Sequence, residues 1–254
     1  MGFIDTVYFS ATKKLYFERK ALDMHRNYSE KLNNLLVYAA QYGLVEMSLY
    51  LLKKGADNFN EALNWAVLTG QKKIVSLMLE KGADNLNQAL LGVATTNRTD
   101  IARLILEKGG DAFIENNIKY LNAALILSVI SEQIEMVKFL INKGADDFSR
   151  PLAHAVIRGQ IKITALLLEN GAEDINEVLG SAAMTGHKDM VDYLIKKGAD
   201  DLNLALEYAA SVSQKEMIDY LLEKGANDLK RALNSAMEND QEETALYILR
   251  KMNN

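Results

Sequence analysis

Few residues of the chain have side chains suited to catalysis or metal binding. The three histidines are His25, His154 and His187, and no two of them stand at the spacing that metal ligands show on one helix. There is no cysteine, which excludes disulfides, thiolate metal sites and cysteine nucleophiles. Phosphate-loop, dinucleotide-binding and Gly-x-Ser-x-Gly motifs do not occur either. We therefore expect a protein that is not an enzyme, with no catalytic residue, no cofactor and no metal.

Paired carboxylates are the remaining candidates for chemistry. Asp146-Asp147 and Asp200-Asp201 each follow a Gly-Ala dipeptide, and each precedes a segment with helical spacing of apolar residues. Carboxylates at such a position cap the free amides of the first helical turn and interact favourably with the helix dipole. We interpret both pairs as recurring helix caps and not as an active site.

A short turn of the type Gly-Ala-Asp, which follows a run of aliphatic residues, organises the whole chain. Its first glycine recurs at positions 55, 82, 109, 144, 171, 198 and 225. The step between these glycines is 27 residues in every case but one, where it is 35. A fixed period over most of a chain indicates stacked structural repeats instead of one globular core.

Residues 55–81 show what one repeat contains. Leu63, Ala66 and Val67 have the spacing of one helix face, and Gly70 suits the left-handed residue that ends a helix. The segment 74–79 is apolar over an arc too wide for a solvent-facing helix, which predicts burial between neighbouring repeats. Capping boxes are predicted after the turns, at Asn58–Glu61, Asn85–Gln88 and Asp174–Glu177. Because the next helix then starts almost at once, no room is left for strands, and the predicted fold is an all-α solenoid of helix-turn-helix repeats.

The period divides the chain into a cap and eight repeats. Residues 1–27 do not follow the period and alternate apolar with basic residues, which predicts an N-terminal helical cap. The predicted repeats are 28–54, 55–81, 82–108, 109–143, 144–170, 171–197, 198–224 and 225–251, within a repeat domain of 28–254. The last repeat has a polar turn at 238–243, which predicts a polar C-terminal cap.

The repeat resembles the ankyrin repeat. The best example is 171–197, which has Leu179, Ala182-Ala183, Gly186-His187, Met190-Val191 and Leu194-Ile195 in the order of that family. The resemblance is strongest to short pseudo-ankyrin arrays of giant viruses and Legionella-like bacteria, whose unit is six residues shorter than the ankyrin unit and lacks its β-hairpin finger. It implies a structural role for His187, a protein-binding function, and action as an effector in a host cell.

The repeat 109–143 is longer than the others by eight residues. The additional segment, 113–120, puts Ile114, Ile118 and Leu121 at helical spacing. Two interpretations stay open: a first helix lengthened by about two turns, and a loop-like finger.

We expect the binding surface on the concave face of the solenoid, which the first helices line. Counting 100° per residue, three positions of each first helix point away from the core. They carry an unusual share of aromatic and aliphatic residues for a solvated face, and such residues are typical of an interface core. The predicted protein-binding residues are Tyr38, Trp65, Leu68, Leu127, Ile130, His154, Ile157, Met184 and Tyr208. For Tyr38, Trp65 and Tyr208 the alternative is packing against the next repeat.

Charge and hydropathy narrow the class of partner. The net charge of −5, with charges of both signs, does not favour nucleic acid, and no segment is long and apolar enough to span a membrane. We expect a monomeric, non-enzymatic scaffold that binds another protein. We expect it to be cytoplasmic, and the cytosol of a host cell is one such location. The alternative is a structural module that self-associates through the groove or through the extension of repeat 109–143.

Overall fold

A computed structural model describes residues 27–253, except for the side chains of 111–113. All regular structure in these residues is helical, and there is no strand between 27 and 253. The all-α fold is thereby confirmed, and the finger-like interpretation of 113–120 is wrong, because that segment is largely helical as well. The N-terminal cap predicted over 1–27 lies outside the described residues, apart from its last position. Within the described part of the chain, no helix is long and apolar enough to cross a membrane.

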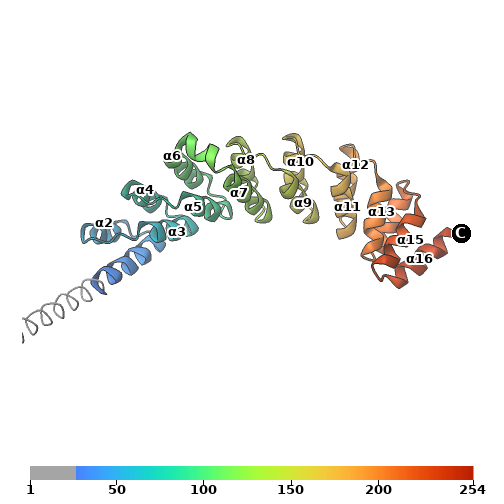
Figure 1. Cartoon of the computed structure of the whole chain (residues 1–254), viewed down its shortest axis with the longest axis horizontal. Helices are drawn as coiled ribbons and strands as arrows, with labels where there is room; N and C mark the ends of the chain where they lie inside the picture. The colour runs from blue at the N-terminus through green and yellow to red at the C-terminus, as the bar shows by residue number, and fades with distance from the viewer. Residues whose placement is uncertain (1–26, 254) are drawn as a thin grey trace, which may run out of the picture. The chain divides into compact units, whose positions relative to one another are not determined.

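The helices form consecutive pairs joined by short turns (Figure 1). The first members of the pairs are the helical residues 27–41, then α3 (Phe59–Thr69), α5 (Leu86–Ala94), α7 (Ile118–Ile130), α9 (Ser149–Ile157), α11 (Ile175–Thr185), α13 (Leu202–Ser211) and α15 (Leu229–Glu238). The second members are α2 (Val45–Lys53), α4 (Lys72–Lys81), α6 (Thr99–Asn116), α8 (Ile134–Asn142), α10 (Ile161–Glu169), α12 (Lys188–Lys196), α14 (Lys215–Glu223) and α16 (Glu242–Met252).

The described chain divides into two compact units, which we treat separately. Unit 1 holds 27–93 and Asp100–Gly110, and unit 2 holds Ala94–Thr99 and 111–253. In unit 2 the first helices α7, α9, α11, α13 and α15 pack side by side in one layer (Figure 1). The second helices α8, α10 and α12 form a row along one side of that layer. Stacking of this kind buries a continuous core between neighbouring pairs.

The core follows the apolar stripes that the period predicts. Leu63, Ala66 and Val67 of α3 are fully buried, and the alanine of the Gly-Ala turn, such as Ala199, is 3% exposed. Gly70 has φ 75° at the C-cap of α3, a conformation that glycine adopts without steric cost. Local patterning therefore determines both the buried face and the end of each helix.

The predicted capping boxes are wrong at Asn58 and Asp174. Neither side chain accepts a hydrogen bond from its own helix, and Asn58 Nδ2 instead donates to Glu61 Oε2 at 2.5 Å. The interpretation of the paired carboxylates as caps is confirmed at Asp201, which accepts from Leu204 N of α13 at 2.8 Å. Its neighbour Asp200 accepts from the side chain of Asn176 at 3.0 Å. The interpretation is wrong at Asp146-Asp147, because α9 has Phe148 at its N-cap and no side chain caps that helix.

In five of the repeats an asparagine ties the following turn to the preceding first helix. Asn176 Oδ1 accepts from the backbone N–H groups of Asp200 and Asp201, at 2.9 and 3.1 Å. Four asparagines elsewhere do the same across 24 and 25 residues, namely Asn33, Asn60, Asn122 and Asn203. These links satisfy amides at the start of the next helix, which would otherwise lack partners inside the protein.

The additional residues of the long repeat form a short helical segment beyond a kink in α6 and also lengthen the first helix α7. In α6 the backbone leaves helical geometry at Gly110 (φ 69°, ψ −179°) and continues helically to Asn116. Asn117, with φ −125°, then separates α6 from α7. One continuous first helix beginning near Ile114 is therefore wrong, although α7 is itself 13 residues long.

Candidate protein-binding surface

Unit 1 contributes three of the predicted binding residues. Tyr38 is exposed and its ring lies 4.6 Å from that of Tyr42, centroid to centroid. Trp65 and Leu68, both on α3, are exposed by 39% and 49%. Trp65 and Leu68 lie one helical turn apart and together present apolar surface to water, and a role of Trp65 in binding stays a prediction.

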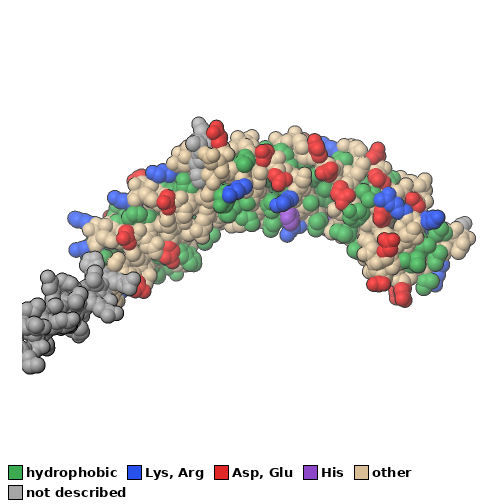
Figure 2. Space-filling view, in the orientation of Figure 1, with side chains coloured by type: hydrophobic (Ala, Val, Ile, Leu, Met, Phe, Trp, Pro, Cys, Tyr) green, Lys and Arg blue, Asp and Glu red, His purple; other side chains and the backbone are tan. Residues whose placement is uncertain are grey.

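In unit 2 the predicted residues lie at the ends of neighbouring first helices. Ile130 and Ile157 are the last residues of α7 and α9, and each is 38% exposed. Leu127, His154 and Met184 are half-buried beside them on α7, α9 and α11. Figure 2 shows hydrophobic side chains gathered along this side of the molecule, over α7 and α9. We call Leu127, Ile130, His154, Ile157 and Met184 the unit 2 patch.

Polar side chains flank the unit 2 patch and hold its backbone in place. His187 Nε2 lies 3.0 Å from the carbonyl oxygen of Ile157, so this ring nitrogen donates to the end of α9. The ring also covers Gly159, where a Cβ atom would come within 3.3 Å of His187 Nδ1. His154 Nδ1 lies 3.4 Å from Nη1 of Arg158, the residue that follows the end of α9. The contacts of His187 link one repeat to the next.

Tyr208 is half-buried and contacts the preceding repeat. Its hydroxyl donates to Glu177 Oε1 of α11, and its ring packs against Gly180, where a Cβ atom would meet ring carbon Cδ2 at 2.9 Å. The hydrogen bond to Glu177 raises the pKa of Tyr208 to about 12, and burial adds to the effect. Of the two roles considered for Tyr208, these contacts describe packing, and its role in binding stays a prediction.

The second helices of the last three repeats form a ladder of ion pairs. Asp192 Oδ1 lies 2.7 Å from Lys224 Nζ, and Asp219 Oδ1 lies 2.6 Å from Lys251 Nζ. The hydrogen bond from Lys224 lowers the pKa of Asp192. Burial opposes the same effect at Asp219, but hydrogen bonds from Lys251 and Tyr247 still lower its pKa. These paired charges are structural contacts between repeats, and exposed pairs of this kind stabilise a fold only modestly.

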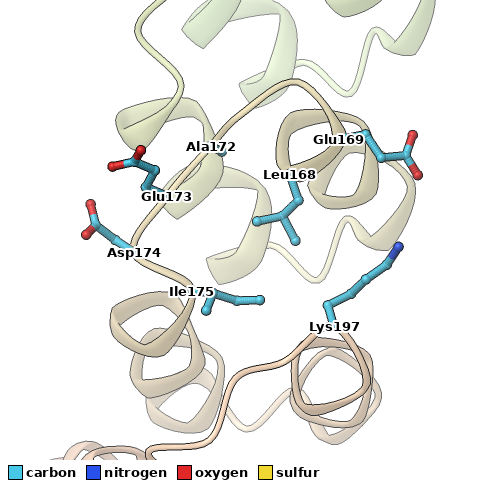
Figure 3. A pocket seen from close by; sticks show the side chains of 7 residues that line it. All are labelled: Leu168, Glu169, Ala172, Glu173, Asp174, Ile175 and Lys197. Atoms are coloured by element: carbon cyan, nitrogen blue, oxygen red, sulfur yellow. The ribbon is translucent and has the colours of Figure 1, made fainter.

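A surface hollow separates the repeats that contain α10 and α11 (Figure 3). It has a volume of about 340 Å³, and the side chains of Leu168 and Ile175 point into it, whereas Glu173 and Asp174 point away. Ser149 occupies the position of the linking asparagine in this repeat. Without that link, Ala172 is half-exposed and Asp174 takes φ 62°. The hollow is therefore explained by a missing structural contact.

The prediction of a polar C-terminal cap is wrong for the two helices of the last repeat, although the turn between them is polar. The side chains of Met237, Leu246 and Leu249 are exposed by 62%, 56% and 40% at the end of unit 2. A comparison of each residue with the one 27 positions earlier reveals these substitutions in the sequence, because Met237 stands where Ala210 does and Leu246 where Asp219 does.

The stacked helix pairs define a helical-repeat solenoid, a class of protein whose repeats present one extended surface. The chain belongs to the ankyrin repeat family, because the family described as Ankyrin repeats (3 copies) matches residues 7–89, 90–178 and 179–254. This confirms the family that the turn and helix motifs indicate. Ankyrin repeats generally mediate protein–protein interactions, and proteins built from them are typically scaffolds without enzymatic activity. A comparison with curated proteins found no match.

Proposed function

We propose that this chain is a non-enzymatic scaffold that binds a partner protein through the unit 2 patch. The observation that carries the proposal is the exposure of Ile130 and Ile157 at equivalent positions of adjacent helices. Met184 of α11 holds the next equivalent position, and the two after it are Ser211 and Glu238, at the ends of α13 and α15. Because polar residues serve there, the helix end itself does not require an apolar side chain.

The patch has the composition of a small interface core. Aliphatic side chains lie at its centre, and Arg158 and His154 stand at its edge, where they can form hydrogen bonds with a partner. The donor contact from His187 to the carbonyl of Ile157 fixes the backbone before binding, which lowers the entropy cost of association. We expect a partner that presents an apolar surface, such as one face of an amphipathic helix.

Trp65 and Leu68 form a second surface of the same kind in unit 1. We propose that it contributes to binding, because tryptophan is one of the side chains whose truncation most often costs about 2 kcal/mol or more. Tyr38 belongs to the same proposal, while its contact with Tyr42 offers an alternative role in packing.

Affinity capture with matched variants tests the unit 2 patch. We expect Ile130→Asp with Ile157→Asp to abolish capture of a partner that the unchanged chain retains, with the helical circular dichroism preserved. Leu49→Asp is the control, because Leu49 is a similarly exposed aliphatic residue on the second helix α2. A partner that still binds the double variant, or that is lost equally with the control, contradicts the proposal. Trp65→Asp shows separately whether unit 1 contributes.

We also propose that the scaffold acts in the cytosol, as an effector in a host cell. The support is the resemblance of its 27-residue period to arrays of intracellular pathogens. Expression of a tagged chain in host cells tests this, and exclusion of the chain from the cytosol would contradict it.

A further inference from the structure

The C-terminal end of unit 2 carries an exposed apolar surface separate from the patch discussed above. Met237 of α15 and Leu246, Leu249 and Met252 of α16 are all exposed, and Figure 2 shows hydrophobic side chains gathered at this end. A hollow of about 450 Å³ lies beside them, lined by residues of both helices. A terminal repeat normally has a polar outer face, because no neighbour covers it.

The surface is not suited to another repeat of the same kind. Asp192 and Asp219 accept hydrogen bonds and ion pairs from the tyrosine and lysine of the following repeat, whereas Leu246 at the equivalent position cannot. Ala210 is fully buried beneath the next repeat, and Met237 at its equivalent position is much larger. A further repeat stacked in the same way would lose the ion pairs and clash with Met237.

The charges on α16 complement those of a second, antiparallel α16. At 100° per residue, Glu242, Leu246, Leu249 and Arg250 lie on one face of the helix, with the acid at its start and the base at its end. Glu242 and Arg250 are eight residues apart, or about 12 Å along the axis. Both are exposed, and within residues 27–253 neither forms an ion pair. Glu242 also reverses the charge of Lys188 and Lys215, which occupy the equivalent positions.

We propose that two copies of this chain associate end to end through α16, related by a two-fold axis that passes near Leu246. Antiparallel pairing about that point places Leu246 against Leu246 of the second copy and Glu242 against Arg250 of the second copy. The symmetry makes the second ion pair as well, since each chain supplies one acid and one base. Leu249 and Met237 then lie along the same apolar contact. This proposed end-to-end dimer differs from the expected monomer and from the expected self-association through the groove or through the extension of repeat 109–143.

The size of the contact sets the expected strength. One helix and its neighbour from each chain bury less surface than the roughly 1,200 Å² of a stable complex, so association should be weak. We expect a dissociation constant in the micromolar range or above, and a dimer that weakens with added salt because its ion pairs are exposed.

Sedimentation equilibrium over a range of concentrations tests the proposal with charge-reversed variants. Glu242→Arg and Arg250→Glu each replace two attractive contacts with two repulsive ones, and we expect each to raise the dissociation constant by roughly tenfold. Mixing the two variants should restore association, because one then carries two bases and the other two acids on this face. Lys230→Glu is the control for Arg250→Glu, because it makes the same change in charge at an exposed residue of α15.

Leu246→Asp tests the apolar part of the contact. Asp192 and Asp219 show that this position accepts aspartate in the same fold, so the variant should keep its helicity and become a monomer. A wild-type chain that stays monomeric to high concentration, or mixed charge variants that do not associate, would overturn the proposal. Ile130→Asp with Ile157→Asp should leave the dimer intact, so this test is independent of partner binding.

Discussion

Asn176 offers the most direct test of how the repeats are held together. Its amide oxygen lies 2.9 Å from Asp200 N and 3.1 Å from Asp201 N, and its Nδ2 lies 3.0 Å from Asp200 Oδ1. Asn176→Ala removes all three hydrogen bonds and leaves two amides at the start of α13 without their acceptor. Asp200 is exposed and Asp201 half-buried, so water replaces part of what is lost.

The magnitude follows from these contacts. A net contribution of about 1 kcal/mol for each of the three hydrogen bonds, partly offset by hydration of the exposed groups, gives a destabilisation of about 2 kcal/mol. For a chain of this length, 1 kcal/mol corresponds to a shift in Tm of about 2–4 °C, which predicts a fall of roughly 4–8 °C. The effect should also be local, since each repeat contacts only its neighbours.

Urea unfolding measures the total effect, and amide hydrogen exchange locates it. We expect the amides of Asp200 and Asp201 to exchange faster in Asn176→Ala, while those in α9 remain protected. Asn170→Ala is the control, because Asn170 makes only a local bond to the carbonyl of Leu166. If the two variants lose equal stability, or if exchange at 200 and 201 is unchanged, the linking role assigned to Asn176 is wrong.

Two further predictions concern the neighbouring contacts. Ser149→Asn should supply the missing link to the turn at 173–174 and raise the free energy of unfolding by about 1–2 kcal/mol, with a urea series as the measurement; no gain would show that the open turn has another cause. Tyr208, with a pKa raised to about 12, should ionise near that pH when its absorbance is titrated, and Glu177→Gln should bring the midpoint closer to 10. Because the raised pKa favours the neutral phenol in the folded state, the associated stability is complete below pH 10 and is lost as the pH rises through about 12; a midpoint near 10 in the unchanged chain would refute this.

The sequence predicts the helices better than it predicts the contacts between repeats. The linking asparagines were visible as a residue repeated every 27 positions, at Asn176 and Asn203 for example, but their partners lie 24 and 25 residues farther along the chain. A capping box, which acts within one helical turn, and a link from an asparagine to the next repeat use the same residue types. The sequence pattern alone therefore favours the capping box. The sequence does not reveal the break between α6 and α7 at Asn117, because the apolar spacing on its two sides is continuous.

Some residues of the candidate surfaces can be predicted from the sequence and others cannot. Exposure of Ile130 and Ile157 follows from helical spacing, which places them away from the core stripe. The packing of Tyr208 on Gly180 depends on two different repeats, so helical spacing could not distinguish it from an exposed binding residue. The apolar end face was likewise hidden by the polar turn at 238–243, which dominates the composition of the last repeat.

By itself the sequence determined the period, the pairs of helices, the buried stripe and the ankyrin family, because each depends on interactions within about one turn of helix or on a spacing repeated along the chain. Only the tertiary structure decided which side chains join neighbouring repeats, where the long repeat breaks, and which apolar residues stay in water. The side chains that join repeats meet across 24 to 31 residues of chain, and exposure depends on which neighbouring repeat covers a side chain. A linear pattern does not contain that geometry.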